Sequence, residues 1–215
     1  IGSCKNTQWL SLFRQALRDK LLLFAMALAF GLIAFLAQQK GGGVGSYVSY
    51  PVGDRIFNAA MAYIGYLWKT VWPANLTVFY PFANDIPAIQ GASAILIVGT
   101  LSVAAWRWGL SNRPLLVGWF WFLITLLPTI GVIKIGDFFM ADRYMYIPQI
   151  GLLIVFSWGM HQIATRWKIP ITVGVACCLV IGLLTISSYH QVKYWKNSKA
   201  LFAHALQVNP QNYFA

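Results

Sequence analysis

The stretch IPITVGVACCLVIGLLTISSY, residues 169–189, decides the fold class because it contains no charged side chain. An α-helix rises about 1.5 Å per residue, so about 20 apolar residues cross a hydrocarbon core of about 30 Å. Four similar runs lie near residues 21–37, 86–106, 115–134 and 148–165. A charge at mid-membrane costs roughly 2.5–3.5 kcal/mol, and these runs carry Lys or Arg only at their ends. The sequence therefore predicts an all-α, multi-span transmembrane bundle with about five spans, the third of them kinked at Pro128.

The overall composition supports a membrane protein. Of the 215 residues, 59% are hydrophobic and only 10% are charged, which is outside the usual range of soluble domains. The net charge of +11 comes from 16 Lys and Arg against five acids. These basic residues are scattered through short loops beside the spans, where they set topology and meet lipid headgroups. No basic stripe is present, so we expect the lipid bilayer as a partner and no nucleic acid.

Residues 1–20 and 38–85 are amphipathic or irregular segments outside the spans. The pattern in 5–20 predicts an interfacial helix on the cytoplasmic side, before a transmembrane domain over 21–189. Within the outward segment 38–85, the aromatic stretch RIFNAAMAYIGYLWKTVW (55–72) predicts an amphipathic helix that is re-entrant or lies in the interface. With five spans, the short basic loops at 107–114 and 166–168 are cytoplasmic.

The tail from His190 onward is polar and predicts a segment that leaves the membrane. Ser198, Phe202, Ala205 and Pro210 have the spacing of the second helix of a tetratricopeptide repeat. Residues 190–215 are therefore interpreted as the start of a repeat region. Because one repeat cannot bury its hydrophobic face, and because Ile1 does not look like a natural start, we expect the chain to be cut at both ends.

Three features together resemble one family. They are WPANLTVFYP (72–81), DRYMYIP (142–148) and the Tyr-Trp tail that enters the repeat-like helix. The chain resembles membrane glycosyltransferase-like proteins with C-terminal tetratricopeptide repeats, bacterial relatives of the transmembrane tetratricopeptide O-mannosyltransferases. The resemblance implies a GT-C fold that transfers a sugar from a polyprenyl-phosphate carrier to protein hydroxyls on the outer face. It also implies a bacterial inner membrane, with periplasmic repeats that bind acceptor or partner proteins.

The sequence departs from this family at the catalytic acids. Such enzymes carry an acidic motif in the first outward loop, but the loop after the first visible span has only Asp54. We therefore expect the catalytic residues upstream of Ile1. The resemblance implies the polyprenyl-phosphate donor and leaves a divalent metal open, while the sequence shows no metal-ligand spacing.

The candidate binding residues are Asp142, Arg143, Tyr144 and Tyr146, at the outward mouth of the fourth span. The planar guanidinium of Arg143 suits a carrier phosphate because it can donate two hydrogen bonds. Asp142 would orient Arg143, and the tyrosines would flank the sugar or lipid head. Arg55 is a second candidate for the phosphate, as is Lys69. The alternative is ordinary interfacial chemistry, in which tyrosines lie at headgroup level and charged residues begin a helix.

Two functions remain open from the sequence. One is the glycosyltransferase, and the other is a non-catalytic membrane anchor that presents the repeats for protein–protein interaction. An O-antigen ligase or polymerase with fused repeats would share the carrier chemistry. A pair of acids after an upstream first span would favour the glycosyltransferase, and its absence would favour the anchor.

Overall fold

The computed structural model describes residues 2–40, 52–78, 80–81, 87–130, 138–210 and 212. The chain divides into two compact units, Ile1–Gly45 and Ser46–Ala215. In the first unit, α1 (Gly2–Lys40) is one continuous helix, so no helix end marks the expected boundary at residue 20. No Gly or Pro occurs between residues 3 and 30 to interrupt it.

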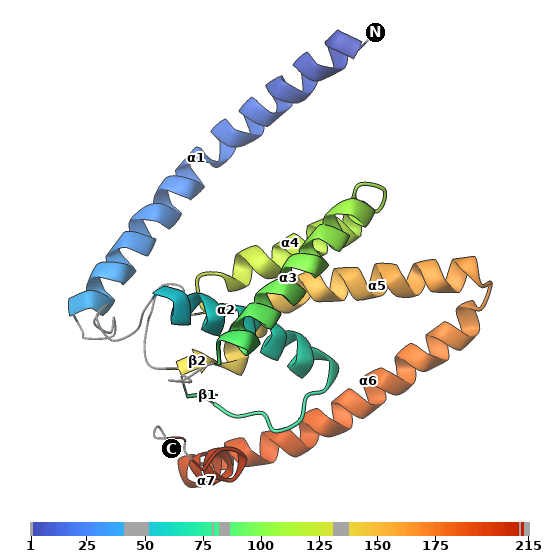
Figure 1. Cartoon of the computed structure of the whole chain (residues 1–215). Helices are drawn as coiled ribbons and strands as arrows, with labels where there is room; N and C mark the ends of the chain where they lie inside the picture. The colour runs from blue at the N-terminus through green and yellow to red at the C-terminus, as the bar shows by residue number, and fades with distance from the viewer. Residues whose placement is uncertain are drawn as a thin grey trace. The chain divides into compact units, whose positions relative to one another are not determined.

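The second unit is helical apart from a two-stranded ribbon (Figure 1). Its elements, in chain order, are α2 (Val52–Val71), β1 (Tyr80–Pro81), α3 (Ala88–Gly109), α4 (Arg113–Leu126), β2 (Phe138–Met140), the 3-10 helix η2 (Asp142–Met145), α5 (Pro148–Arg166), α6 (Pro170–Val192), the 3-10 helix η3 (Lys193–Lys196) and α7 (Ser198–Val208). The helical fold class is confirmed. The antiparallel pairing of β1 with β2 was not predicted.

Several helix ends follow from the sequence. Pro occupies the first turn of α4, α5 and α6, where its missing N–H breaks no helical hydrogen bond. Asn197 caps α7, because its side-chain oxygen accepts a hydrogen bond from the Ala200 amide at 2.8 Å. The predicted helix in the tail is therefore present.

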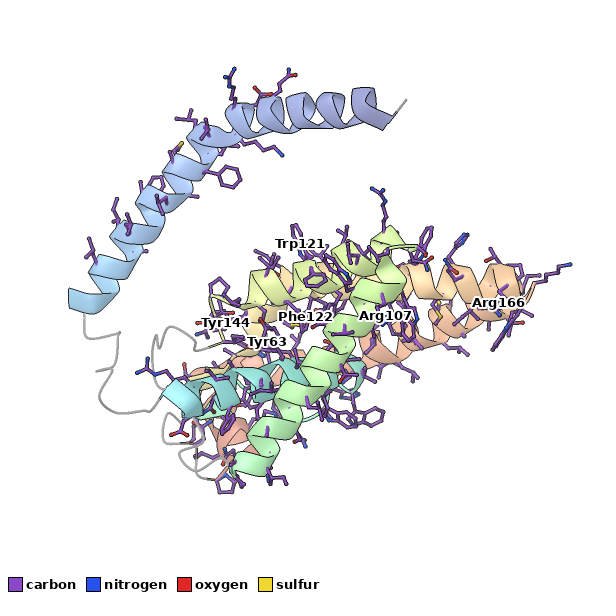
Figure 2. All side chains as sticks on the ribbon, turned by 45° about the horizontal axis from the view of Figure 1, so that its top comes forward. Tyr63, Arg107, Trp121, Phe122, Tyr144 and Arg166 are labelled. Atoms are coloured by element: carbon purple, nitrogen blue, oxygen red, sulfur yellow. The ribbon has the colours of Figure 1, made fainter. Side chains whose placement is uncertain are left out.

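The core of the second unit lies between α2, α3 and α4. Tyr66 and Phe122 are fully buried within it. The rings of Tyr63 and Phe122 meet edge to face with centroids 5.7 Å apart (Figure 2), and the Tyr63 hydroxyl donates to the Leu123 carbonyl at 2.7 Å. Trp119 on α4 also donates to the Ser102 hydroxyl on α3 at 3.0 Å. The aromatic stretch 55–72 thus forms a helix whose tyrosines tie α2 into the bundle.

Two glycines allow α4 and α5 to approach closely. A Cβ added at Gly118 would lie 2.5 Å from the Gly151 carbonyl oxygen, and one added at Gly151 would meet the Gly118 carbonyl. No larger side chain fits at this crossing without movement of the backbone. The contact positions the start of α5, and therefore η2 immediately before it.

Among the described residues, two helices are long and apolar enough to cross a membrane, α3 and the helical segment Pro170–Lys196. Little of either helix is covered by protein: 17% of the most apolar window of α3 is buried, and none of the corresponding window in Pro170–Lys196. A helix that is apolar on all sides and uncovered by protein needs another apolar environment. This exposure favours a membrane.

The helix found at the third expected span is shorter than predicted and ends earlier. Helix α4 has 14 residues and ends at Leu126, before the expected kink at Pro128, which lies in a turn. A helix of that length rises about 21 Å, less than a hydrocarbon core of about 30 Å. Residues 131–137, the end of the expected span and beyond, lie outside the described residues.

The two short basic loops lie at one end of the helical unit. The Gln162 amide near the end of α5 donates to the Asn112 side chain in the α3–α4 loop at 2.8 Å. In Figure 2, Arg166 lies at the opposite end of this unit from Tyr144. The predicted grouping of loops 107–114 and 166–168 on one side is consistent with this arrangement.

Candidate functional site

A cavity of about 450 Å³ lies where the end of α2, η2 and the C-terminal part of α6 come together. Its volume is within the range of small-molecule sites. Its wall includes the polar side chains of Lys69, Thr77, Asp142, Arg143, Tyr146 and Ser188. Trp195 of η3 also lines it, so the DRYM segment and the beginning of the tail share one cavity.

The loop after α2 forms one wall of this cavity and is shaped by Lys69. The Lys69 ammonium donates to the carbonyls of Ala74 and Asn75, the latter at 3.0 Å. Asn75 has a φ of 54°, a left-handed conformation that asparagine tolerates better than most residues. The turn brings Thr77 and Val78 to the cavity.

A buried tyrosine holds η2 in place. The Tyr66 hydroxyl donates to the Ala141 carbonyl at 3.0 Å and accepts from the Ala141 amide at 2.9 Å. Both partners are fully buried. Because Ala141 directly precedes Asp142, this pair of hydrogen bonds fixes where the acid enters the cavity.

Asp142 is the acidic residue whose charge acts on the other titratable groups of the cavity. The Tyr80 hydroxyl donates to its Oδ2 at 3.3 Å. Burial raises the pKa of Asp142 to about 6, while the Tyr80 hydrogen bond, the positive charge of Lys69 and the Thr77 backbone act in the opposite direction. Asp142 is therefore a carboxylate at neutral pH that takes up a proton under mildly acidic conditions.

Burial also shifts the pKa values of Lys69 and Tyr80, the two neighbours of Asp142. It lowers the pKa of Lys69, against the attraction of Asp142, which raises it. The pKa of Tyr80 is raised by burial and by the Asp142 charge, so Tyr80 stays a neutral donor. With Lys69 and Arg143 charged and Asp142 ionised, the cavity wall has an excess of one positive charge. Such a wall favours an anion.

The structure brings together three of the five predicted binding residues. Asp142, Arg143 and Tyr146 line the cavity, and Tyr146 is 80% exposed. Tyr144 packs against the hydrophobic core instead, with the Arg143 guanidinium carbon 5.2 Å from its ring centre. A cation over an aromatic face is attracted to it, so Tyr144 supports Arg143 from outside the cavity.

The fifth predicted binding residue, Arg55, lies away from the cavity. It is in the first turn of α2, whereas Lys69 is in the last turn, about 21 Å further along the helix axis. Arg55 is not among the residues that line the cavity.

Sequence reasoning missed several residues that line the cavity: Tyr66, Thr77, Gln149, Ser188 and Trp195. It also missed Tyr80, which donates to Asp142. Thr77 and Tyr80 belong to the WPANLTVFYP block, whose distinctive pattern was the available signal. The contribution of Ser188 and Trp195 depends on how α6 returns to η2, and no local pattern predicts it.

The divalent metal that the resemblance left open finds no ligand set in this part of the molecule. Among the described residues, no three His, Cys, Asp or Glu side chains lie close enough together to hold an ion. Of the residues that line the cavity, Asp142 alone supplies a carboxylate.

The chain is similar to known protein O-mannosyl-transferases. It is 26% identical to protein O-mannosyl-transferase TMTC1 of Homo sapiens over 183 residues, or 76% of this chain and 21% of that protein. It is 24% identical to Tmtc1 of Drosophila melanogaster over 128 residues, and to TMTC3 of Homo sapiens over 129 residues. Those two alignments cover 58% and 60% of this chain, and 14% of each relative.

These similarities support a relationship with the O-mannosyl-transferases over a limited part of their length. The chain spans between about a ninth and a fifth of the length of the relatives that it matches. No family model and no solved structure matches it.

Proposed function

We propose that this chain forms the carrier-binding part of an integral-membrane, GT-C-type glycosyltransferase. The full-length protein would transfer a sugar from a polyprenyl-phosphate carrier to protein hydroxyls on the outer face of the membrane. The similarity to protein O-mannosyl-transferases supports the reaction class. The observation that carries the proposal is that Lys69 from α2, Arg143 from η2 and the carboxylate of Asp142 line the same cavity.

The two cations suit a phosphate group. Arg143 can donate two parallel hydrogen bonds to phosphate oxygens, whereas the Lys69 ammonium acts as a compact charge. As the bond between the sugar and the phosphate breaks, negative charge grows on the leaving phosphate. Positive groups already held in place stabilise that charge more than they stabilise the bound donor. Asp142 balances part of this positive charge.

The apolar part of the cavity suits a lipid carrier. Leu184 and Ser188 of α6 line the cavity, and the same two residues line a groove that continues along α6 past Ile181 and Val192. A carrier could place its phosphate beside Arg143 and its hydrocarbon along this groove. The exposed apolar surface of α6 would then face carrier and bilayer.

The tail is proposed as the start of a tetratricopeptide array on the outer side of a bacterial inner membrane. Helix α7 has Ala205 buried at the position where the repeat pattern requires a small residue. Such an array would bring acceptor proteins to the same end of the bundle as Arg143.

The test is carrier binding by the full-length protein with Arg143→Lys. This change keeps the charge but removes the planar fork, so we expect affinity for a fluorescent short-chain polyprenyl phosphate to fall by about tenfold, or about 1.4 kcal/mol. Arg166→Lys, at the opposite end of α5, is the matched control and should leave affinity unchanged.

Equal binding by wild type and Arg143→Lys would show that the guanidinium of Arg143 does not bind the carrier phosphate. If wild-type protein bound no polyprenyl phosphate at all, the carrier-binding proposal would fail. The second candidate, a membrane anchor for a repeat scaffold, would then account for the spans and tail.

A further inference from the structure

A second, smaller cavity of about 120 Å³ adjoins the first and is the basis of a further inference. The two cavities share walls at Leu76, Thr77, Val78, Asp142 and Trp195. The far wall of the small cavity comes from the tail, through Gln191, Leu201 and His204. The tail thus forms part of the site itself.

One residue on the wall of the small cavity is a buried threonine, Thr77. Thr77 is only 6% exposed, and among the described residues its hydroxyl makes no hydrogen bond. A buried hydroxyl without a partner destabilises the folded protein, so such atoms usually meet a ligand or water. Thr77 can both donate to and accept from a hydroxyl, and the Asp142 carboxylate nearby can accept.

The tail wall is held firmly against the loop after α2. The Leu76 carbonyl accepts a hydrogen bond from the Gln191 amide at 3.1 Å, and the His204 Nε2 lies 3.2 Å from the same oxygen. The His204 ring also stacks on Tyr194, with centroids 3.7 Å apart and planes 9° apart. These contacts position α7 beside the loop that supplies Thr77 (Figure 1).

The different sizes of the two cavities indicate that they bind different groups. A volume of 120 Å³ is about that of four waters, which is enough for a short side chain but not for a carrier head. The larger cavity has the two cations and the apolar continuation. Asp142 lies on the shared wall, where two occupants would meet.

We propose that the small cavity binds the hydroxyl-bearing side chain, serine or threonine, of an acceptor polypeptide, with Thr77 and Asp142 as its hydrogen-bond partners. Leu201 and His204 of the tail limit the size of that side chain. This inference deepens the proposed glycosyltransferase function and depends on it. It assigns acceptor selection to residues that the tail helix and the loop after α2 contribute together.

The experiment measures peptide binding by the full-length protein, separately from carrier binding. The probes are a fluorescent pentapeptide with one central threonine and the matched peptide with alanine. Wild type should bind the threonine peptide several-fold more tightly, and Thr77→Val should abolish the difference. Leu201→Phe should fill the small cavity and weaken binding of the threonine peptide, while affinity for polyprenyl phosphate stays as in wild type.

Two further variants keep the test informative if Leu201→Phe does not fold. Leu201→Ala enlarges the cavity and should allow a tyrosine peptide to bind. Leu206→Phe is the matched control, because Leu206 is on the same helix, 42% exposed and absent from the cavity wall.

Equal binding of threonine and alanine peptides by wild type would overturn the acceptor site even where the carrier binds. Loss of carrier binding in wild type would instead overturn the proposed function.

Discussion

The Tyr66 hydroxyl bridges the amide and the carbonyl of Ala141, at 2.9 and 3.0 Å, across 75 positions of sequence. One side chain of α2 therefore satisfies both polar backbone groups of the residue before Asp142. Buried backbone groups need such partners. The Ala141 carbonyl also accepts from the Tyr144 amide of η2 at 3.0 Å, so the Ala141 amide is the group that depends on the Tyr66 hydroxyl. The position of the acid in the cavity depends on a residue that lies within the hydrophobic core.

Tyr66→Phe should destabilise the protein and displace Asp142. The change removes the partner of the buried Ala141 amide, which costs about 1–3 kcal/mol, while the Ala141 carbonyl keeps its hydrogen bond from the Tyr144 amide. We expect an unfolding midpoint lower by several degrees in detergent, measured by thermal unfolding. Tyr189→Phe is the control, since Tyr189 is 67% exposed and should be neutral. An unchanged midpoint in Tyr66→Phe would contradict the importance of this bridge.

Asp142 should make stability depend on pH. Burial raises its pKa from 3.8 to about 6, so the folded state favours the protonated carboxyl. The stabilising contribution is complete below about pH 4 and is lost as the pH rises through 6. The loss amounts to at most about 3 kcal/mol, at 1.36 kcal/mol per pH unit.

Asp142→Asn should remove this dependence. The variant should be more stable than wild type at pH 8, and the two should converge at pH 4, in thermal unfolding measured across that range. Tyr80→Phe is an independent check, because the Tyr80 hydrogen bond lowers the pKa of Asp142. Without this hydrogen bond, the stability of Tyr80→Phe should fall at a higher pH than that of wild type. A flat wild-type profile would count against the buried position of Asp142.

The glycine crossing of α4 and α5 should be intolerant of a methyl group. Gly118→Ala or Gly151→Ala should cost about 1–3 kcal/mol, because the added Cβ meets the backbone of the facing helix. Gly159→Ala on α5 is the matched control, as a methyl group added there would have nothing within 4 Å. It should be neutral or slightly stabilising, since alanine favours a helix. Thermal unfolding of all three variants distinguishes close packing from general sensitivity of α5.

The sequence predicted the elements of this molecule better than their contacts. The apolar run at 169–189 predicted α6, and the spacing around Ala205 predicted a helix in the tail. Composition and periodicity are local, so they identify such helices directly. They also identified Arg143 and Asp142 as unusual for their surroundings.

Contacts between distant segments were not predictable in this way. Nothing near Thr77 indicates that His204 and Gln191 close over the same loop, because those contacts depend on the path of α6. The same limit explains Tyr144, which sequence alone placed with Tyr146 although the two side chains have different surroundings. In a 3-10 helix, neighbouring residues point in different directions, and only the packing decides which one reaches the cavity.

Membrane topology can be tested by labelling with an impermeant maleimide. In a background without native cysteines, Tyr146→Cys and Lys199→Cys should react from the same side of the membrane, since η2 and the tail line one cavity. Ser111→Cys, in the exposed α3–α4 loop, should react only from the opposite side. Permeabilised membranes provide the control for reactivity of each thiol. Labelling of Tyr146→Cys and Ser111→Cys from one side would contradict the five-span arrangement, because α3 and α4 would then not separate the cavity from the basic loops.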